Sequence, residues 1–337
     1  MKYLKHIILC SCSCILLNSC SGQEHRINGV SFVAARDTVD STHVSPILKV
    51  NANYAAIMPF GFIRELSNPE IIHNTDSQWF GETRVGAIQY IQELRKKQIK
   101  VMVKPQIWVW RGAFTGYIKM NNEEDWRRLE NSYTSFIMEY AHLAQEVKAA
   151  IFCIGTELEH FVENRPDYWI ELINEIKAVY SGKLTYAANW DEFKRTPFWD
   201  QLDYIGVDAY FPVSQLKTPT VEDCVKGWET HKNTLVNLSA KWDRKILFTE
   251  YGYRSVDYAG KEPWKSDSAM NVVNLVAQVN SLEALYQSVW TEDWFAGGFI
   301  WKWFIYHDKV GGEDNPMFTP QNKPAEAVIA KYYQPQN

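Results

Sequence analysis

Eight apolar runs, each bounded by turn-forming residues, divide this sequence of 337 residues and predict eight β-strands. They lie at about residues 28–35, 53–60, 100–108, 149–156, 184–190, 203–210, 245–251 and 296–303. Amphipathic segments separate most of the runs, and in the clearest, 124–147, apolar side chains recur every three or four residues. Strand followed by helix, repeated along a chain, is typical of parallel strands joined by right-handed crossovers. We therefore predict an α/β fold, the (β/α)8 TIM barrel.

The connections between the predicted strands depart from a regular barrel in one place. Further helices are expected at about residues 84–98, 166–181, 222–241, 267–290 and 323–333. Only residues 191–202, which include Pro197, separate the fifth strand from the sixth, so the fifth helix should be reduced to a turn. Because no linker rich in Pro, Ser or Gly interrupts residues 27–333, we interpret residues 27–337 as a single (β/α)8 domain.

The first residues have the pattern of a secretory signal. Lys2 and Lys5 precede an apolar run, residues 7–17, that is too short to span a bilayer. A positively charged start followed by a short apolar segment predicts a signal peptide, which we place at residues 1–19.

The end of this segment points to a lipid anchor. Residues 17–20, Leu-Asn-Ser-Cys, resemble the lipobox of bacterial lipoproteins, which implies lipidation of Cys20 and a short tether at residues 20–26. An ordinary signal peptide with an incidental cysteine is the alternative. Because Ser21 does not resemble the inner-membrane retention signal, we expect a bacterial outer membrane lipoprotein on the periplasmic or cell-surface face.

The net charge argues against one class of partner, and the cysteine content argues against a disulfide. The whole chain has a formal net charge of −5, and loss of Lys2 and Lys5 with the signal peptide makes the remainder more acidic still. An acidic chain argues against nucleic acid as a partner. Beyond Cys20 the sequence retains Cys153 and Cys224, which we expect to be free buried thiols rather than a disulfide.

Polar residues gather where the predicted strands end, which in a parallel barrel is the functional face. The residues at these ends are Lys104 and Trp108, Thr156 and Glu157, Asn189 and Trp190, Asp208 and Tyr210, Glu250, and Trp301. Two of them, Glu157 and Glu250, each follow a buried-looking apolar strand. Two carboxyl groups that face one cleft are the equipment of a glycosidase.

With these residues identified, the sequence resembles the clan A glycoside hydrolases, and within them glycoside hydrolase family 113, whose characterised members are chiefly β-1,4-mannanases. The resemblance is carried by Gly29-Val30-Ser31-Phe32, Lys104-Pro105, Gly155-Thr156-Glu157-Leu158, Asp208-Ala209-Tyr210, Thr249-Glu250-Tyr251-Gly252 and Trp301-Lys302-Trp303. It implies that Glu157 is the catalytic acid/base and that Glu250 is the catalytic nucleophile.

The chemistry of a retaining glycosidase asks for the same two roles, because one carboxyl must donate a proton while the other attacks as an anion. We predict that the carboxyl groups of Glu157 and Glu250 lie about 5–5.5 Å apart, whereas a separation beyond about 7 Å would favour inversion. Glu159 is the alternative acid/base, because it has the same strand parity as Glu157.

Contacts to the sugar are expected from several strand ends. Many clan members carry Asn before the acid/base to bond the sugar 2-hydroxyl, whereas this sequence has Thr156, and Asn189 could compensate. An altered contact of this kind suits mannose, whose 2-hydroxyl is axial. Tyr210 is expected either to hydrogen-bond the nucleophile or to be an aromatic residue of the barrel rim.

Tryptophan is abundant, with 14 residues, and flat indole rings stack on the apolar faces of sugars. Trp301 is the candidate floor of the −1 subsite, and Trp108 and Trp190 are candidate walls for neighbouring sugars. Lys104 could bond a sugar hydroxyl or form a structural ion pair.

No pattern in the sequence points to a metal or another cofactor. His73, His160, Asp208 and His307 lack the spacing of metal ligands, and the chain has no HExxH motif and no Gly-x-Ser-x-Gly motif. We therefore predict cofactor-free double-displacement hydrolysis of a β-linked polysaccharide or oligosaccharide, with residues 27–337 as the catalytic domain.

The expected substrate is β-1,4-mannan or manno-oligosaccharides. The alternatives are another β-glycan, such as a glucan or galactan, and a non-catalytic surface lipoprotein that binds glycan. Whether cleavage is endo or exo depends on the loops at residues 61–83 and 109–123, which either leave the groove open or block one end.

Overall fold

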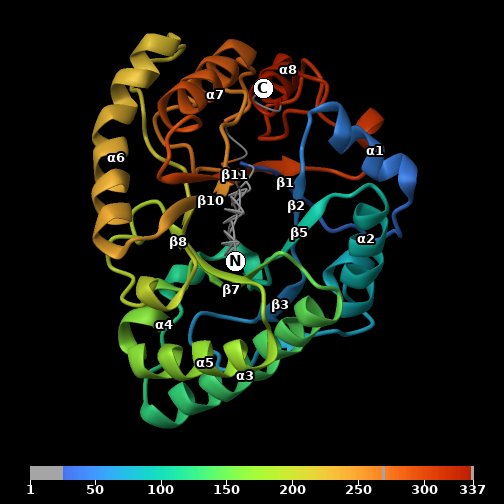
Figure 1. The fold of residues 1–337 in the computed structure, drawn as a ribbon, viewed down its shortest axis with the longest axis vertical. Helices are drawn as coiled ribbons and strands as arrows, with labels where there is room; N and C mark the ends of the chain where they lie inside the picture. The colour runs from blue at the N-terminus through green and yellow to red at the C-terminus, as the bar shows by residue number, and fades with distance from the viewer. Residues whose placement is uncertain (1–25, 268–269, 335–337) are drawn as a thin grey trace, which may run out of the picture.

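A computed structural model describes residues 26–267 and 270–334 of the chain (Figure 1). The predicted signal peptide, Cys20 and the tether before Arg26 lie outside the described residues. Among the helices that are described, none is both long enough and apolar enough to cross a membrane.

Eight parallel strands close into a barrel in the order β1-β11-β10-β9-β8-β7-β5-β2. They are β1 (Ile27–Phe32), β2 (Tyr54–Ile57), β5 (Lys100–Val103), β7 (Ile151–Thr156), β8 (Lys183–Asn189), β9 (Tyr204–Asp208), β10 (Lys245–Tyr251) and β11 (Phe295–Trp303). The predicted (β/α)8 barrel is confirmed, and each of the eight predicted strands contributes one barrel strand.

Two of the predicted strands, 53–60 and 100–108, are longer than the barrel strands that the structure has there. The chain leaves the barrel after β2 and β5, and the residues that follow form a separate small sheet from β3 (Phe60–Ile63), β4 (Ile72–His73) and β6 (Gln106–Val109). Pro59 and Pro105 stand at the two breaks. Proline cannot donate to a strand ladder, so the barrel pairing ends there and a new pairing, β3 with β6, begins beyond it.

Helices surround the barrel (Figure 1). They are α1 (Ser41–Lys49), α2 (Arg84–Lys96), α3 (Glu123–Glu146), α4 (Glu159–Asn164), α5 (Pro166–Val179), α6 (Val221–Trp242), α7 (Leu275–Val289) and α8 (Pro324–Tyr332). Between β8 and β9 the only helical element described is the short 3-10 turn η4 (Trp199–Gln201), so the reduced fifth helix is confirmed.

Three helix predictions need correction. The short helices α1 and α4 were missed, and α1 contains Pro46, which masks its helical pattern. Helix α7 begins at Leu275 rather than near residue 267, because Asn274 caps it by accepting a hydrogen bond from the Ala277 backbone.

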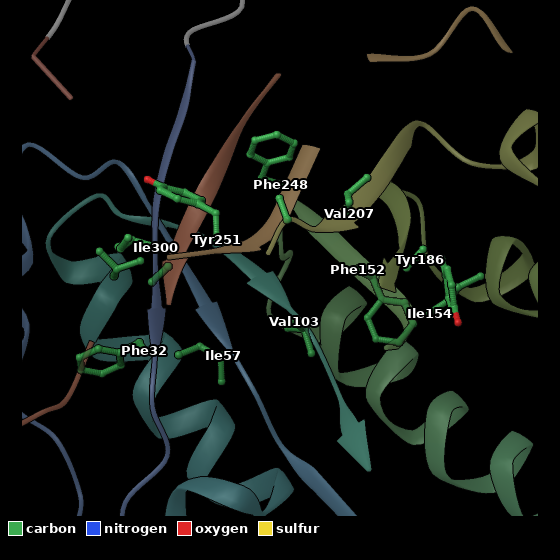
Figure 2. Packing of buried hydrophobic residues seen from close by; sticks show 14 of the residues in the cluster. Phe32, Ile57, Val103, Phe152, Ile154, Tyr186, Val207, Phe248, Tyr251 and Ile300 are labelled. Atoms are coloured by element: carbon green, nitrogen blue, oxygen red, sulfur yellow. The ribbon is translucent and has the colours of Figure 1, made fainter. Parts of the chain in front are cut away.

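The core has two parts, because side chains of a strand point alternately to the helices and into the barrel. Outward-facing residues such as Phe152 and Ile154 pack in the large cluster between strands and helices (Figure 2). Inward-facing residues such as Ile151 and Cys153 form a smaller cluster inside the barrel. Cys153 and Cys224 are both buried and free, which confirms the expectation of two thiols. The apolar interior gives way to charged residues at the carboxyl ends of the strands.

Candidate active site

Three charged residues meet at the carboxyl end of the barrel. Lys104 follows β5, Asp208 ends β9, and Glu250 lies in β10. Lys104 and Asp208 have no exposed surface, and Glu250 is 6% exposed. Because an unpaired buried charge is strongly unfavourable, the contacts among these residues determine whether each can remain charged.

Glu250 reaches this cluster because β10 is irregular. Its pairing with β9 shifts register between Phe248 and Glu250. In a regular strand the side chains of Thr249 and Glu250 would point to opposite faces. The extra residue of this bulge lets both face the interior, where the Thr249 hydroxyl donates to Asp208 Oδ1 at 2.7 Å.

Lys104 supplies the positive charge of the cluster. Its Nζ lies 3.2 Å from both carboxylate oxygens of Asp208 and 2.5 Å from Glu250 Oε1. Burial lowers the pKa of the Lys104 ammonium, but the negative charges of Asp208 and Glu250 outweigh this effect and raise the pKa. Of the two interpretations of Lys104, the structure favours the ion pair, because the side chain has no exposed surface with which to meet a sugar.

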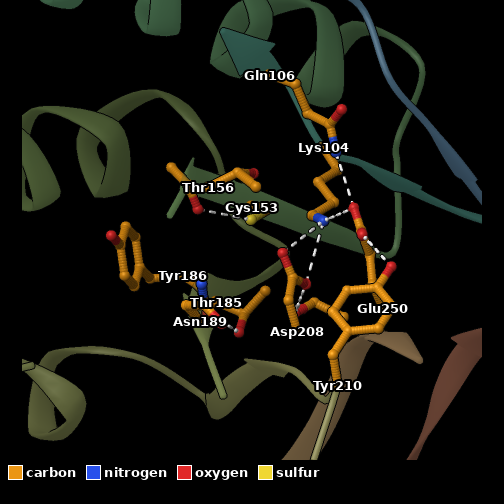
Figure 3. Close-up of polar contacts among 12 residues, drawn as sticks. Lys104, Gln106, Cys153, Thr156, Thr185, Tyr186, Asn189, Asp208, Tyr210 and Glu250 are labelled. Atoms are coloured by element: carbon orange, nitrogen blue, oxygen red, sulfur yellow. Dashed lines mark hydrogen bonds and ion pairs between the residues drawn. The ribbon is translucent and has the colours of Figure 1, made fainter. Parts of the chain in front are cut away.

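Glu250 accepts hydrogen bonds from three different side chains (Figure 3). Besides Lys104, the Gln106 amide Nε2 donates to Oε1 at 2.9 Å. The Tyr210 hydroxyl donates to Oε2 at 2.8 Å, which is the contact expected of Tyr210 as a partner of this carboxylate. Donors on both oxygens, one of them a cation, favour the ionised form of a carboxyl group.

Glu157 stands just beyond the end of β7 in a left-handed backbone conformation, with φ of 50°. This region is unfavourable for a residue with a Cβ atom. Two hydrogen bonds hold the turn: the Glu157 N–H donates to the Ala187 carbonyl at 2.8 Å, and the Leu158 N–H donates to the Tyr186 hydroxyl at 2.7 Å. The backbone therefore fixes the direction from which the Glu157 side chain leaves the strand end.

The electrostatics of Glu157 are opposite to those of Glu250. Among the described residues, the Glu157 carboxyl has no hydrogen-bond partner, and burial raises its pKa well above the usual range. The negative charges of Asp208 and Glu250 raise this pKa further, while Lys104 opposes them. Glu157 is therefore a carboxyl group that favours its neutral, proton-carrying form.

The two polar residues predicted to contact the sugar 2-position are both partly exposed. The Thr156 hydroxyl lies 3.5 Å from the Pro105 carbonyl. Asn189 accepts a hydrogen bond from the Trp190 backbone at 2.7 Å through its side-chain carbonyl. Its amide nitrogen has no hydrogen-bond partner within the described part of the chain, so Asn189 keeps donors for another group.

The three predicted tryptophans lie on different elements. Trp301 is partly exposed near the end of β11, and Trp108 is 50% exposed on β6. Trp190 follows β8 and stacks on Trp264, with 4.8 Å between ring centroids and 19° between ring planes. Nothing in the sequence marks Trp264 as part of the site, because its stacking partner Trp190 is more than seventy residues away.

Glu159, the alternative acid/base, lies outside the charged cluster. It begins α4, and its carboxylate pairs with the guanidinium of Arg195, whose Nε is 2.7 Å away. Arg195 also donates to the Asp191 carbonyl. The structure thus ties Glu159 to the loop after β8, and Glu157 is the glutamate of this segment whose pKa is raised by the cluster.

The sequence alone does not indicate the role of several residues of the site. Sequence patterns assign no role to Gln106, Thr249 and Glu192, and they mark Asp208 as a strand-end residue without a catalytic role. Lys302 follows Trp301 and lies over its ring, at 5.4 Å from the centroid, and burial lowers the pKa of its ammonium. The alternating pattern of the strands could have suggested Lys302 or Gln106, but nothing in the sequence marks the bulge that turns Glu250 inward.

The arrangement pairs a carboxyl group whose pKa is raised with a carboxyl group that accepts hydrogen bonds on both oxygens. Such a pair can donate a proton to a leaving group and attack or stabilise a developing cation on the other side. Within residues 26–267 and 270–334, no group of three or more His, Cys, Asp or Glu side chains could hold a metal ion.

Comparison with protein families decides the class of this site. The family model for Glycoside Hydrolase Family 113 matches residues 34–323, which is most of the chain. The chain belongs to glycoside hydrolase family 113. The protein is therefore a glycoside hydrolase, and the resemblance inferred from the sequence is confirmed. No match was found among curated proteins.

Solved structures share the fold of this family 113 enzyme. A family 113 β-mannanase from Alicyclobacillus acidocaldarius has a TM-score of 0.80 at 23% identity, over 91% of this chain and 97% of that one. Another family 113 β-1,4-mannanase has a TM-score of 0.80 at 21% identity, over 93% of this chain and 100% of that one. A Faecalibacterium prausnitzii β-glucuronidase matches with a TM-score of 0.61 at 14% identity, over 91% of this chain but 48% of its own.

Proposed function

We propose that this family 113 enzyme is a retaining glycoside hydrolase that cleaves β-1,4-mannan or manno-oligosaccharides by double displacement. One observation carries the proposal. Glu157 lacks hydrogen-bond partners among the described residues and has a raised pKa, whereas Glu250 accepts from Lys104, Gln106 and Tyr210. Opposite environments of two carboxyl groups are what an acid and a nucleophile require.

In the first step, Glu157 gives its proton to the glycosidic oxygen as the bond to the anomeric carbon breaks. A carboxylate oxygen of Glu250 attacks the anomeric carbon from the other face, and a glycosyl-enzyme ester forms. Oε2 is the better attacking atom, because it accepts one hydrogen bond while Oε1 accepts two. Lys104 and Gln106 hold the other oxygen, so the carboxylate keeps its orientation as it loses charge.

In the second step, the ionised Glu157 takes a proton from a water molecule, whose oxygen attacks the anomeric carbon. The ester bond to Glu250 breaks, and the sugar leaves with its original anomeric configuration. Glu157 is again protonated and Glu250 again ionised, so the starting state returns. A carboxyl separation of about 5–5.5 Å remains our prediction for this mechanism.

The mannan assignment rests on the sugar-contacting residues and on the fold. The similar solved structures include family 113 β-1,4-mannanases. Thr156 carries a shorter hydroxyl side chain where many clan members have Asn, and the amide nitrogen of Asn189 can donate to an axial 2-hydroxyl. Trp301 offers an indole face for the apolar side of the ring.

Product analysis of the purified protein tests this proposal. β-Mannan, β-glucan, β-galactan and their short oligosaccharides are incubated with the wild type and with Glu157→Ala, Glu250→Ala and Glu159→Ala variants. We expect cleavage of mannan, its loss in the Glu157 and Glu250 variants, and its persistence in the Glu159 control. NMR of the first product should show the β-anomer.

The other outcomes separate the alternatives. An α-anomer as first product would replace double displacement with inversion. Cleavage of glucan or galactan alone would change the substrate and leave the mechanism standing. Glycan binding without any cleavage would support the non-catalytic interpretation. Product lengths distinguish endo from exo action.

We also propose that Cys20 anchors the enzyme to the bacterial outer membrane through lipid. The support is the sequence Leu-Asn-Ser-Cys at residues 17–20 behind a signal-like segment. Fractionation of cells that express the full chain should place the protein with membranes, and Cys20→Ala should release it from them. Membrane association that survives the substitution would exclude this anchor.

A further inference from the structure

A buried glutamate outside the reaction scheme, Glu192, lies close to the turn that carries Glu157. It follows β8 and is 1% exposed. Burial of a carboxyl group is unfavourable unless hydrogen bonds compensate, so its partners indicate what it does. Neither the proton transfer nor the attack on the anomeric carbon uses this residue.

Glu192 is connected to the turn after β7 through the Tyr186 side chain of β8. Its Oε1 accepts a hydrogen bond from the Tyr186 hydroxyl at 2.7 Å, and its Oε2 accepts one from the Asn189 backbone at 3.0 Å. The Tyr186 hydroxyl accepts in turn from the Leu158 N–H at 2.7 Å. A continuous chain of hydrogen bonds therefore runs from Glu192 through Tyr186 to the peptide directly after Glu157.

This chain of hydrogen bonds ends beside a backbone position that is unfavourable for a non-glycine residue. Glu157 has φ of 50°, and a non-glycine residue keeps such a conformation only where its surroundings hold it. The Ala187 carbonyl holds the N–H of Glu157, and the Tyr186 hydroxyl holds the next N–H along the chain. Glu192 fixes the position of that hydroxyl, because Tyr186 donates its proton to it.

We propose that Glu192 is a positioning residue for Glu157: through the Tyr186 hydroxyl it holds the left-handed turn from which Glu157 delivers its proton to the leaving group. The inference rests on the proposed acid/base role of Glu157. Burial raises the pKa of Glu192 to about 8, and only in its ionised form does its negative charge add to those that raise the pKa of Glu157. Without Glu192, the turn loses the partner of Tyr186, and the proton of Glu157 is misplaced relative to the glycosidic oxygen.

The dependence of rate on the leaving group tests this role. A manno-oligosaccharide needs a proton on its leaving oxygen, whereas 2,4-dinitrophenyl β-mannoside has a leaving group that departs without one. We compare kcat/KM, which reports the steps up to formation of the glycosyl-enzyme, for the wild type, Glu192→Gln and Tyr186→Phe. Misplacement of the acid should lower kcat/KM on the oligosaccharide by about 10²-fold and change it by less than about threefold on the aryl mannoside.

Two further variants complete the design. Because Tyr186 and Glu192 act in one chain, the double variant Tyr186→Phe/Glu192→Gln should lose little more than either single variant. Glu130→Gln is the matched control, since Glu130 pairs with Arg165 away from the site, and it should show no leaving-group dependence. Melting temperatures show whether each variant folds. If Glu192→Gln does not fold, Tyr186→Phe alone tests the inference.

Equal losses on both substrates would mean that Glu192 merely supports the fold, and unchanged activity on both would mean that it supports nothing in the reaction. Either result overturns the inference while the proposed function stands. A wild type that cleaves neither substrate would overturn the proposed function itself, and the inference with it.

Discussion

The two strand-end glutamates, Glu157 and Glu250, differ in what surrounds an identical side chain. Glu250 accepts from a cation, an amide and a phenol, whereas the Glu157 carboxyl has no hydrogen-bond partner among the described residues and lies near negative charge. Hydrogen bonds stabilise the ionised form of one, while burial and like charge stabilise the neutral form of the other. The comparison shows that contacts from neighbouring strands give two residues of one type different surroundings.

The same two residues differ in how the backbone presents them. Glu250 is turned inward by a bulge inside β10, and Glu157 leaves β7 through a single left-handed residue. Both are departures from regular strand geometry. A regular barrel would have sent at least one of these carboxyl groups elsewhere, so the irregularities are part of the site.

The largest predicted difference lies between alanine variants at these two positions. Glu157→Ala should lower kcat/KM on a manno-oligosaccharide by about 10²–10⁴-fold but spare attack on 2,4-dinitrophenyl β-mannoside, and azide should accelerate release of the glycosyl-enzyme. Glu250→Ala should lose both substrates, because no nucleophile remains. Glycosyl azide formation, followed by NMR, is the measurement. Azide rescue giving a β-product in the Glu250 variant instead would reverse the two assignments.

The next effect concerns the charge that supports Glu250. Lys104→Met leaves Asp208 and Glu250 buried without their cation and should lower the free energy of unfolding by about 3–5 kcal/mol. Lys96→Met, which breaks an exposed pair with Glu93, should cost no more than about 1 kcal/mol. Urea denaturation measures both. Equal losses in the two variants would show that the buried cluster does not depend on Lys104.

A smaller effect should follow from loss of the Tyr210 hydroxyl. Tyr210→Phe removes one hydrogen bond to the Glu250 carboxylate, worth about 1.5–3 kcal/mol, and should lower kcat/KM by about 10- to 150-fold. Because the contact is on the proposed nucleophile, the rates on activated and unactivated substrates should fall alike. Tyr168→Phe, a partly buried tyrosine on α5 that contacts Thr134, is the control and should keep wild-type kinetics. A loss confined to the unactivated substrate would instead connect Tyr210 to proton donation by Glu157.

Much of the fold could be predicted because local patterns in the sequence indicate the strands and helices. Apolar runs and the spacing of helices located the eight barrel strands, and the short interval at residues 191–202 showed that the fifth helix is reduced. The breaks at Pro59 and Pro105 could also have been read, since proline interrupts a strand ladder. The small sheet of β3, β4 and β6 could not, because apolar residues continue across both breaks.

The site was predictable in its residue types and in the contact of Tyr210 with Glu250, but not in its other contacts. Both glutamates stand at strand ends, where a barrel gathers functional groups. The partners of Lys104, however, are 104 and 146 residues away in the sequence, and only the closed barrel brings them together. The bulge at Thr249 and the left-handed Glu157 carry no glycine or other marker. Such features arise from pairing between strands, which a single sequence does not display.

The smallest predicted effect is a shift in pH dependence. As the proposed acid, Glu157 must carry a proton in the first step, so kcat/KM should fall as pH rises through its raised pKa. Among the charges that raise this pKa, Asp208 comes first, after burial.

Asp208→Asn removes that negative charge and leaves Lys104 less compensated, and both changes lower the pKa of Glu157. The alkaline limb of the kcat/KM profile on a manno-oligosaccharide should therefore move to lower pH. Asp200→Asn, on the exposed turn before β9, should leave the limb in place. The activated aryl mannoside should show no such limb in either variant, because its first step needs no proton. A limb that stays fixed or moves to higher pH in Asp208→Asn would mean that the charge of Asp208 does not raise the pKa of Glu157. The contrast between the two glutamates would then rest on burial and hydrogen bonding and not on the charge of Asp208.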